Sequence, residues 1–141
     1  MKIIRILQSF FIALALISST TAWASGATVV YHIDDSANAR MVLGNVTNHL
    51  IAAPDTKIHV VSNGKGIEFL LVDAQDSNGK PYAPAIQALA AKGVAFKVCR
   101  NSLNSRKLGD NAVIAEATIV PAAVAEIARL EIDEKAAYIK P

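Results

Sequence analysis

A single cysteine, Cys99, occurs in the whole sequence, so no disulfide can form within one chain. This absence excludes a disulfide-rich scaffold, and it means that side-chain packing must stabilise the fold. Apolar residues make up 52% of the chain and charged residues only 18%, which also excludes a disordered protein. The lone thiol has three roles open to it: a buried apolar side chain, a reactive group, or one half of an intermolecular bridge.

Acidic residues are absent before Asp34, whereas Lys2 and Arg5 stand at the start of the chain. The apolar run 10–17 follows, and then Ala22-Trp23-Ala24, which has the A-x-A spacing of a secretory cleavage site. The apolar run is far shorter than the roughly 20 residues that a membrane-spanning helix needs. The order of a basic, an apolar and a small-residue segment therefore predicts a signal peptide rather than an anchor.

We predict cleavage after Ala24, so that residues 1–24 are a secretory signal peptide and residues 25–141 form a single mature domain. The mature protein is then expected in the periplasm or outside the cell. Loss of Lys2 and Arg5 lowers the formal net charge from +2 to zero. Because no basic cluster with interleaved aromatics remains, we expect no nucleic-acid partner, and no membrane association after signal removal.

Motifs for several common kinds of chemistry are absent as well. Gly64-Lys65-Gly66 is too short for a Walker loop, and no G-x-G-x-x-G segment follows the first expected strand. The sequence therefore lacks the glycine-rich loop that binds the phosphates of a nucleotide. His32, His49 and His59 lack the close spacing of zinc ligands, and no serine-centred nucleophile elbow occurs. We therefore expect no cofactor and no metal, and thiol chemistry remains as the candidate.

Short β-branched and aromatic runs alternate with helical patterns along the mature domain. The expected strands are 28–33, 57–61, 94–98, 118–120 and 136–139. The expected helices are 37–51, 85–91 before Gly93, and one with Pro121 in its first turn and Val124, Ile127, Ala128 and Leu130 on its apolar face. Segment 67–72 fits a helical turn or a buried strand, 101–111 a loop with some helix, and 113–116 a helix. The alternation predicts an α/β fold with a mainly parallel sheet and helices on both faces.

Polar or reactive residues follow three of the expected strands. In an open parallel sheet the carboxyl ends of the strands share one edge, which is where ligands bind. We therefore predict a site at this edge, with Cys99 as the catalytic residue. The binding residues predicted beside it are His32, Asp34, Asn63, Gly64, Arg100 and Asn101. Arg100 and a helix N-terminus at the strand end would both lower the pKa of the thiol by favouring the thiolate.

Each of these residues also has a purely structural interpretation. Arg100 fits a solvated surface charge, and His32 fits a hydrogen-bonded structural histidine beside Tyr31. Asp34 and Asp35 are typical N-cap residues for the helix that follows.

A second pair of polar residues lies on the first expected helix. Asn45 and Asn48 share one face of that helix, where their amides would bond a loop or a neighbouring subunit.

Several segments together resemble the DsrE/DsrF-like family of small sulfur-relay proteins, in particular its secreted branch. The segments that carry the resemblance are 29–34, 45–48, 60–64, 93–102, 120–130 and 137–141, which include Val29-Val-Tyr-His-Ile-Asp34 and Gly93-Val-Ala-Phe-Lys-Val-Cys-Arg-Asn-Ser102. The resemblance implies a flavodoxin-like or Rossmann-like fold, assembly as a homo-oligomer (trimer or hexamer), and a persulfide on Cys99.

Two functions follow as expectations. The first is a periplasmic sulfur carrier in which Cys99 accepts sulfane sulfur from a donor protein or passes it to an acceptor. The sequence leaves open whether this carrier is an enzyme, that is, a sulfurtransferase with catalytic turnover. The second is a non-catalytic oligomeric module that binds a small ligand or a protein at the same sheet edge. Replacement of Cys99 by serine would abolish the first function and spare the second.

Overall fold

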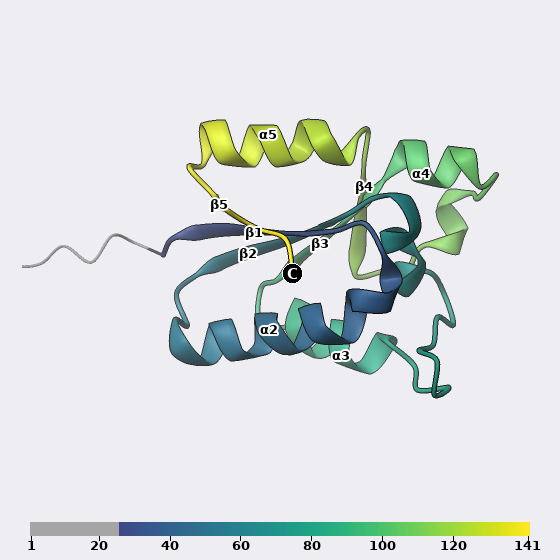
Figure 1. Cartoon of the computed structure of the whole chain (residues 1–141), viewed down its shortest axis with the longest axis horizontal. Helices are drawn as coiled ribbons and strands as arrows, with labels where there is room; N and C mark the ends of the chain where they lie inside the picture. Colours follow the sequence, from purple (N-terminus) through teal and green to yellow (C-terminus); the bar gives the residue numbers. More distant parts are fainter. Residues whose placement is uncertain (1–25) are drawn as a thin grey trace, which may run out of the picture.

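A computed structural model describes residues 26–141 as a five-stranded parallel sheet in the order β4-β3-β2-β1-β5 (Figure 1). The strands are β1 (Thr28–Ile33), β2 (Lys57–Ser62), β3 (Ala95–Cys99), β4 (Ala117–Val120) and β5 (Ala137–Ile139). Within residues 26–141, no helix is long and apolar enough to cross a membrane. The signal peptide predicted over residues 1–24 lies outside the described residues.

Helices cover both faces of the sheet, as the sequence predicted. The α-helices are α2 (Ala39–Ala52), α3 (Ala83–Ala90), α4 (Arg100–Ser105) and α5 (Ala123–Asp133), and the 3-10 helices are η1 (Ser36–Asn38), η2 (Gly64–Leu70) and η3 (Asp110–Ala112). Figure 1 shows α2 and α3 on one side of the sheet and α5 on the other. The parallel strands thus have the crossover helices that such pairing requires.

The two faces of the sheet are packed unequally. On the α2 and α3 side, Tyr31, Val60 and Phe96 belong to a large core that includes buried side chains of both helices and of η2. On the α5 side the apolar cluster is much smaller. It consists of Val30, Val61, Cys99, Ala123, Ile127, Leu130 and Ala136. Because buried apolar area supplies most of the packing free energy, the α5 face contributes less of it than the face covered by α2, α3 and η2.

Most of the expected strands and helices agree with the structure to within a few residues, and three segments differ. Segment 67–72, which the sequence left open, lies mostly in η2. Segment 113–116 is not helical: Val113 forms an isolated antiparallel bridge with Leu71, and the helical turn η3 precedes it. Segment 101–111 contains more helix than expected, because α4 begins directly after Cys99.

The phase of α5 also differs from the prediction. Ala123, Ile127 and Leu130 face the sheet, whereas Val124 is 65% exposed. Successive helical residues are about 100° apart, so burying Ala123 turns Val124 toward solvent. Pro121 lies outside the helix, because the extended backbone of the N-cap residue Ala122 separates it from the first turn.

Gly93 and Gly66 are among the glycines that the backbone requires. Gly93 has φ +89 just after α3, as expected for a residue that ends a helix in the left-handed region. Gly66 packs η2 against the end of β1, where an added Cβ would lie 2.2 Å from the carbonyl oxygen of Ile33. This close approach fixes the loop after β2 beside the end of β1.

Replacement of Gly66 by alanine is expected to lower the free energy of unfolding by at least about 2 kcal/mol, because the new methyl group overlaps backbone rather than a movable side chain. Gly44→Ala is the matched control, since Gly44 lies within α2 and nothing surrounds its added Cβ. That variant should gain about 0.5–1 kcal/mol. Urea unfolding measures both, and equal stabilities of the two variants would contradict the close approach.

Candidate functional site

Cys99 is the last residue of β3 and the N-cap residue of α4. Its Sγ accepts a hydrogen bond from the backbone N–H of Ala123, the first residue of α5, at 3.4 Å. The residue is only 5% exposed and belongs to the apolar cluster under α5. The thiol therefore lies at the expected edge of the sheet, but it is covered rather than open to solvent as the proposed chemistry had led us to expect.

Opposing effects act on the ionisation of Cys99. Burial raises the pKa of the thiol, but the backbone amides of Ala123, Ser102 and Asn101 and the hydroxyl of Ser102 lower it. The net result is a pKa below the ordinary value of the thiol. The donors come from the starts of α4 and α5, so the predicted contribution of a helix N-terminus is present.

Arg100 has a different role from the one suggested by its place beside Cys99. Its guanidinium donates two hydrogen bonds to the carboxylate of Asp110, and the second joins Nη2 to Oδ2 at 2.9 Å. This exposed pair ties α4 to η3 and agrees with the structural interpretation of Arg100. The next residue, Asn101, has an exposed side chain, and its backbone amide rather than its carboxamide is what acts on the Cys99 thiol.

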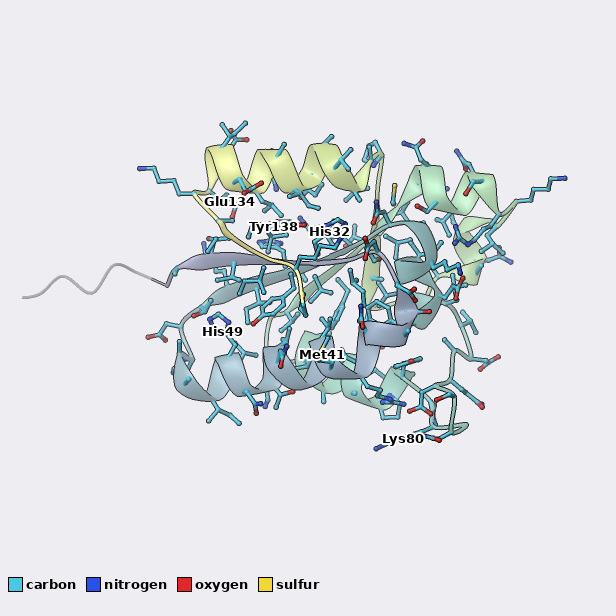
Figure 2. The ribbon with its side chains drawn as sticks, viewed as in Figure 1. His32, Met41, His49, Lys80, Glu134 and Tyr138 are labelled. Atoms are coloured by element: carbon cyan, nitrogen blue, oxygen red, sulfur yellow. The ribbon has the colours of Figure 1, made fainter. Side chains whose placement is uncertain are left out.

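His32 lies on the same face of the sheet as Cys99 and joins two other elements. Its Nδ1 is 2.7 Å from the hydroxyl of Tyr138 in β5, and its Nε2 is 2.9 Å from Oδ1 of Asn63 after β2. Figure 2 shows His32 and Tyr138 together on the α5 side of the sheet, whereas Met41 and His49 lie on the α2 side. An amide oxygen only accepts, so Nε2 carries the proton and a neutral ring accepts the Tyr138 O–H at Nδ1.

Tyr138 was not predicted as a site residue. It faces His32 because β5 pairs with β1 in the register Val30↔Tyr138, which puts both aromatic rings on one face. The strand pattern 136–139 was the available signal, but it does not reveal which strand β5 pairs with.

Ser102 connects the loop after β2 with the thiol. Its hydroxyl accepts the backbone N–H of Gly64 at 2.9 Å, and both its amide and its hydroxyl lower the pKa of Cys99. Ser62 pairs with Val98, so the residues that follow them, Asn63 and Cys99, leave neighbouring strands side by side. Ser102 was also missed, although its place one helical turn after Cys99 was a usable signal.

The two aspartates after β1 act separately. Asp35 accepts the N–H of Ala37 at 2.9 Å, which confirms its predicted capping role. Asp34 instead pairs with Lys140 at 2.5 Å, beyond the end of β5. This exposed ion pair fastens the C-terminal strand to the site edge.

The paired asparagines of α2 take no part in this edge. The side chains of Asn45 and Asn48 are exposed on α2, away from Cys99.

A layer of charged side chains lies between the sheet and α5. Lys97 of β3 forms an ion pair with Glu126 of α5, and both side chains are largely buried. Hydrogen bonds from Arg129 and Lys97 lower the pKa of Glu126 to about 2. Nearby, Nε2 of His59 is 3.9 Å from the carboxylate of Glu134, while its buried Nδ1 has no partner.

A polar cavity of about 600 Å³ lies at the same edge but toward α2 and α3. Its lining includes Arg40, Lys65, Glu68 and Asp76, a mixture of charges, and Cys99 is not part of it. Within residues 26–141 no group of three histidine, cysteine or acidic residues is placed to hold a metal ion.

The structure is that of a parallel α/β protein with a buried thiol at the edge formed by the carboxyl ends of its strands. The pKa of this thiol is lowered. The chain belongs to the DsrE/DsrF-like family, whose model matches residues 13–141. It is similar to the structure of a protein of unknown function from Methanobacterium thermoautotrophicum, at 26% identity and a TM-score of 0.71, over 82% of this chain and 99% of that one. No curated protein matches the chain.

Replacement of His59 by leucine is expected to flatten the dependence of stability on pH. Burial, and then Lys97, lower the pKa of His59 below its ordinary value of 6.5, while Glu134 and Glu126 raise it and Arg129 lowers it further. As the pH falls below about 6.5, the unfolded chain therefore binds the proton first and the native state loses stability. Urea unfolding at about pH 7.5 and about pH 5.5 measures the loss. An equal loss in His59→Leu would contradict this assignment.

Proposed function

We propose that this protein is a periplasmic sulfur carrier that holds sulfane sulfur as a persulfide on Cys99. The observation that carries the proposal is the thiol at the end of β3, whose pKa is lowered by donors from α4 and α5. A lower pKa raises the thiolate fraction at neutral pH, and the thiolate is the nucleophile in sulfur exchange. Membership of a family that includes sulfur-relay proteins supports the same chemistry.

The transfer is balanced without an outside oxidant. The Cys99 thiolate attacks the terminal sulfur of a donor persulfide, R–S–SH, so that a new S–S bond forms on Cys99 and the donor leaves as its thiolate, R–S⁻. An acceptor thiolate then attacks the outer sulfur of the Cys99 persulfide, and the Cys99 thiolate is released. Amide donors around Sγ stabilise the negative charge at the start and at the end of the cycle.

Export and assembly belong to the same proposal. Cleavage after Ala24 would deliver the mature domain to the periplasm, and a homo-oligomer would cover exposed apolar side chains of α5. Val124 and Ile132 are 65% and 77% exposed on that helix.

A second candidate function is a non-catalytic binding module. The burial of Cys99 favours it, because the polar group formed by His32, Asn63 and Tyr138 is more accessible than the thiol. This module would bind its small ligand or protein partner equally well after Cys99→Ser.

Treatment of the signal-free protein with a low-molecular-weight persulfide is expected to add one sulfur atom to Cys99, detected by intact-protein and peptide mass spectrometry. Cys99→Ser is the control and should gain no sulfur. A reducing thiol should remove the added sulfur from the wild type. If the folded wild type gains no sulfur under conditions that modify a free thiol peptide, Cys99 has a packing role and the binding module is favoured.

Replacement of Ser102 by alanine is expected to raise the pKa of the Cys99 thiol, because one of the groups that favour the thiolate is lost. The rate of alkylation of Cys99 as a function of pH measures this change, and the profile of Ser102→Ala should move to higher pH. Ser105→Ala is a matched control on α4, since the Ser105 hydroxyl donates to the carbonyl of Ser102 instead. Superimposable profiles for Ser102→Ala and the wild type would exclude the proposed role of the hydroxyl.

A further inference from the structure

We infer that α5 is a gate over Cys99, held closed by the ion pair between Lys97 and Glu126, and that reagents reach the sulfur only when this helix moves. The part played by the gate in sulfur transfer rests on the function proposed above. The gate itself rests on the contacts of α5 with the sheet, which are independent of any function.

The cover of Cys99 comes largely from α5. The N–H of Ala123 contacts Sγ, and Ala123 and Ile127 belong to the same buried cluster as the thiol. On the other side, Val61 of β2 belongs to that cluster and is held within the sheet. Displacement of α5 would therefore remove its cover from Cys99 while β3 keeps its place between β2 and β4.

A largely buried ion pair contributes to the attachment of α5. Its apolar cluster is small, and Lys97 and Glu126 form an ion pair within the same interface, with side chains only 13% and 14% exposed. Lys97 precedes Cys99 by two residues on β3, so both side chains project from the same face of the sheet. The strand that carries the thiol thus also carries the anchor of the helix that covers it.

When α5 covers the sheet, one buried polar atom beneath it lacks a hydrogen-bond partner. Nδ1 of His59 is buried beneath α5 without a hydrogen-bond partner, and a buried polar atom in that state disfavours the conformation that buries it. Movement of α5 would let water reach this atom. Arg129 of α5 and Glu134, which follows the last residue of that helix, pair with each other and complete the charged groups near His59.

Gating is tested by the rate at which iodoacetamide alkylates Cys99 in the full mature protein. Glu126→Gln leaves Lys97 without its carboxylate partner, and Lys97→Gln leaves Glu126 paired with Arg129 alone, so that α5 is no longer tied to β3 by charge. Both variants should therefore react at least about tenfold faster than the wild type. The matched control is Arg40→Gln, which breaks the Arg40–Asp76 ion pair on the opposite face and should react at nearly the wild-type rate. Hydrogen exchange should accelerate over residues 123–133 in the two gate variants but not over 39–52.

The denaturant dependence of alkylation separates helix movement from global unfolding. Movement of α5 exposes little surface, so the rate should rise only weakly with low urea concentrations. Unchanged rates in both gate variants, equal acceleration in Arg40→Gln, or a urea dependence as steep as that of global unfolding would each overturn the gate. Faster alkylation without persulfide formation in Glu126→Gln would refute the sulfur carrier and leave the gate standing.

Discussion

The parallel pairing of β1, β2 and β3 is the constraint on which the site depends. The register that sets Ile33 beside Ser62 and Ser62 beside Val98 brings three chain exits to one edge. His32, Asn63 and Cys99 come from distant parts of the sequence, yet all three lie at this edge, and the described residues contain neither a disulfide nor a group placed to bind a metal ion. A shift of one residue in this register would turn each side chain to the other face of the sheet.

One face of the sheet carries most of the apolar core, and the other face carries Cys99. The large core with α2, α3 and η2 holds the strands in place, and it contains no cysteine. The α5 face combines a small apolar cluster with charged residues, which is a weaker arrangement because burying charges costs solvation free energy. Chemistry that requires an occasional opening is better placed on this second face, because the larger core can remain intact while α5 moves.

Much of the fold was readable from the sequence, because β-branched runs such as Thr28–Ile33 and the helical spacing over 37–51 are local signals. The edge location of His32, Asn63 and Cys99 followed from the expected parallel sheet, because the carboxyl ends of parallel strands share one edge. Burial of Cys99 was one of the roles that the sequence left open, and the sequence could not decide it, since burial depends on the phase of α5 and Val124 and Ala123 compete for the inner position. The Lys97–Glu126 pair was invisible for the same reason: its partners lie far apart in sequence and meet only after the helix docks.

The attachment of β5 has a consequence for solubility. This edge strand spans only Ala137–Ile139, and its neighbour Lys140 is held by Asp34 beyond the end of β1. A short edge flanked by charge offers few free amides and carbonyls as a template for a strand from another molecule. The same contact that completes the site edge therefore also protects the sheet against edge-to-edge aggregation.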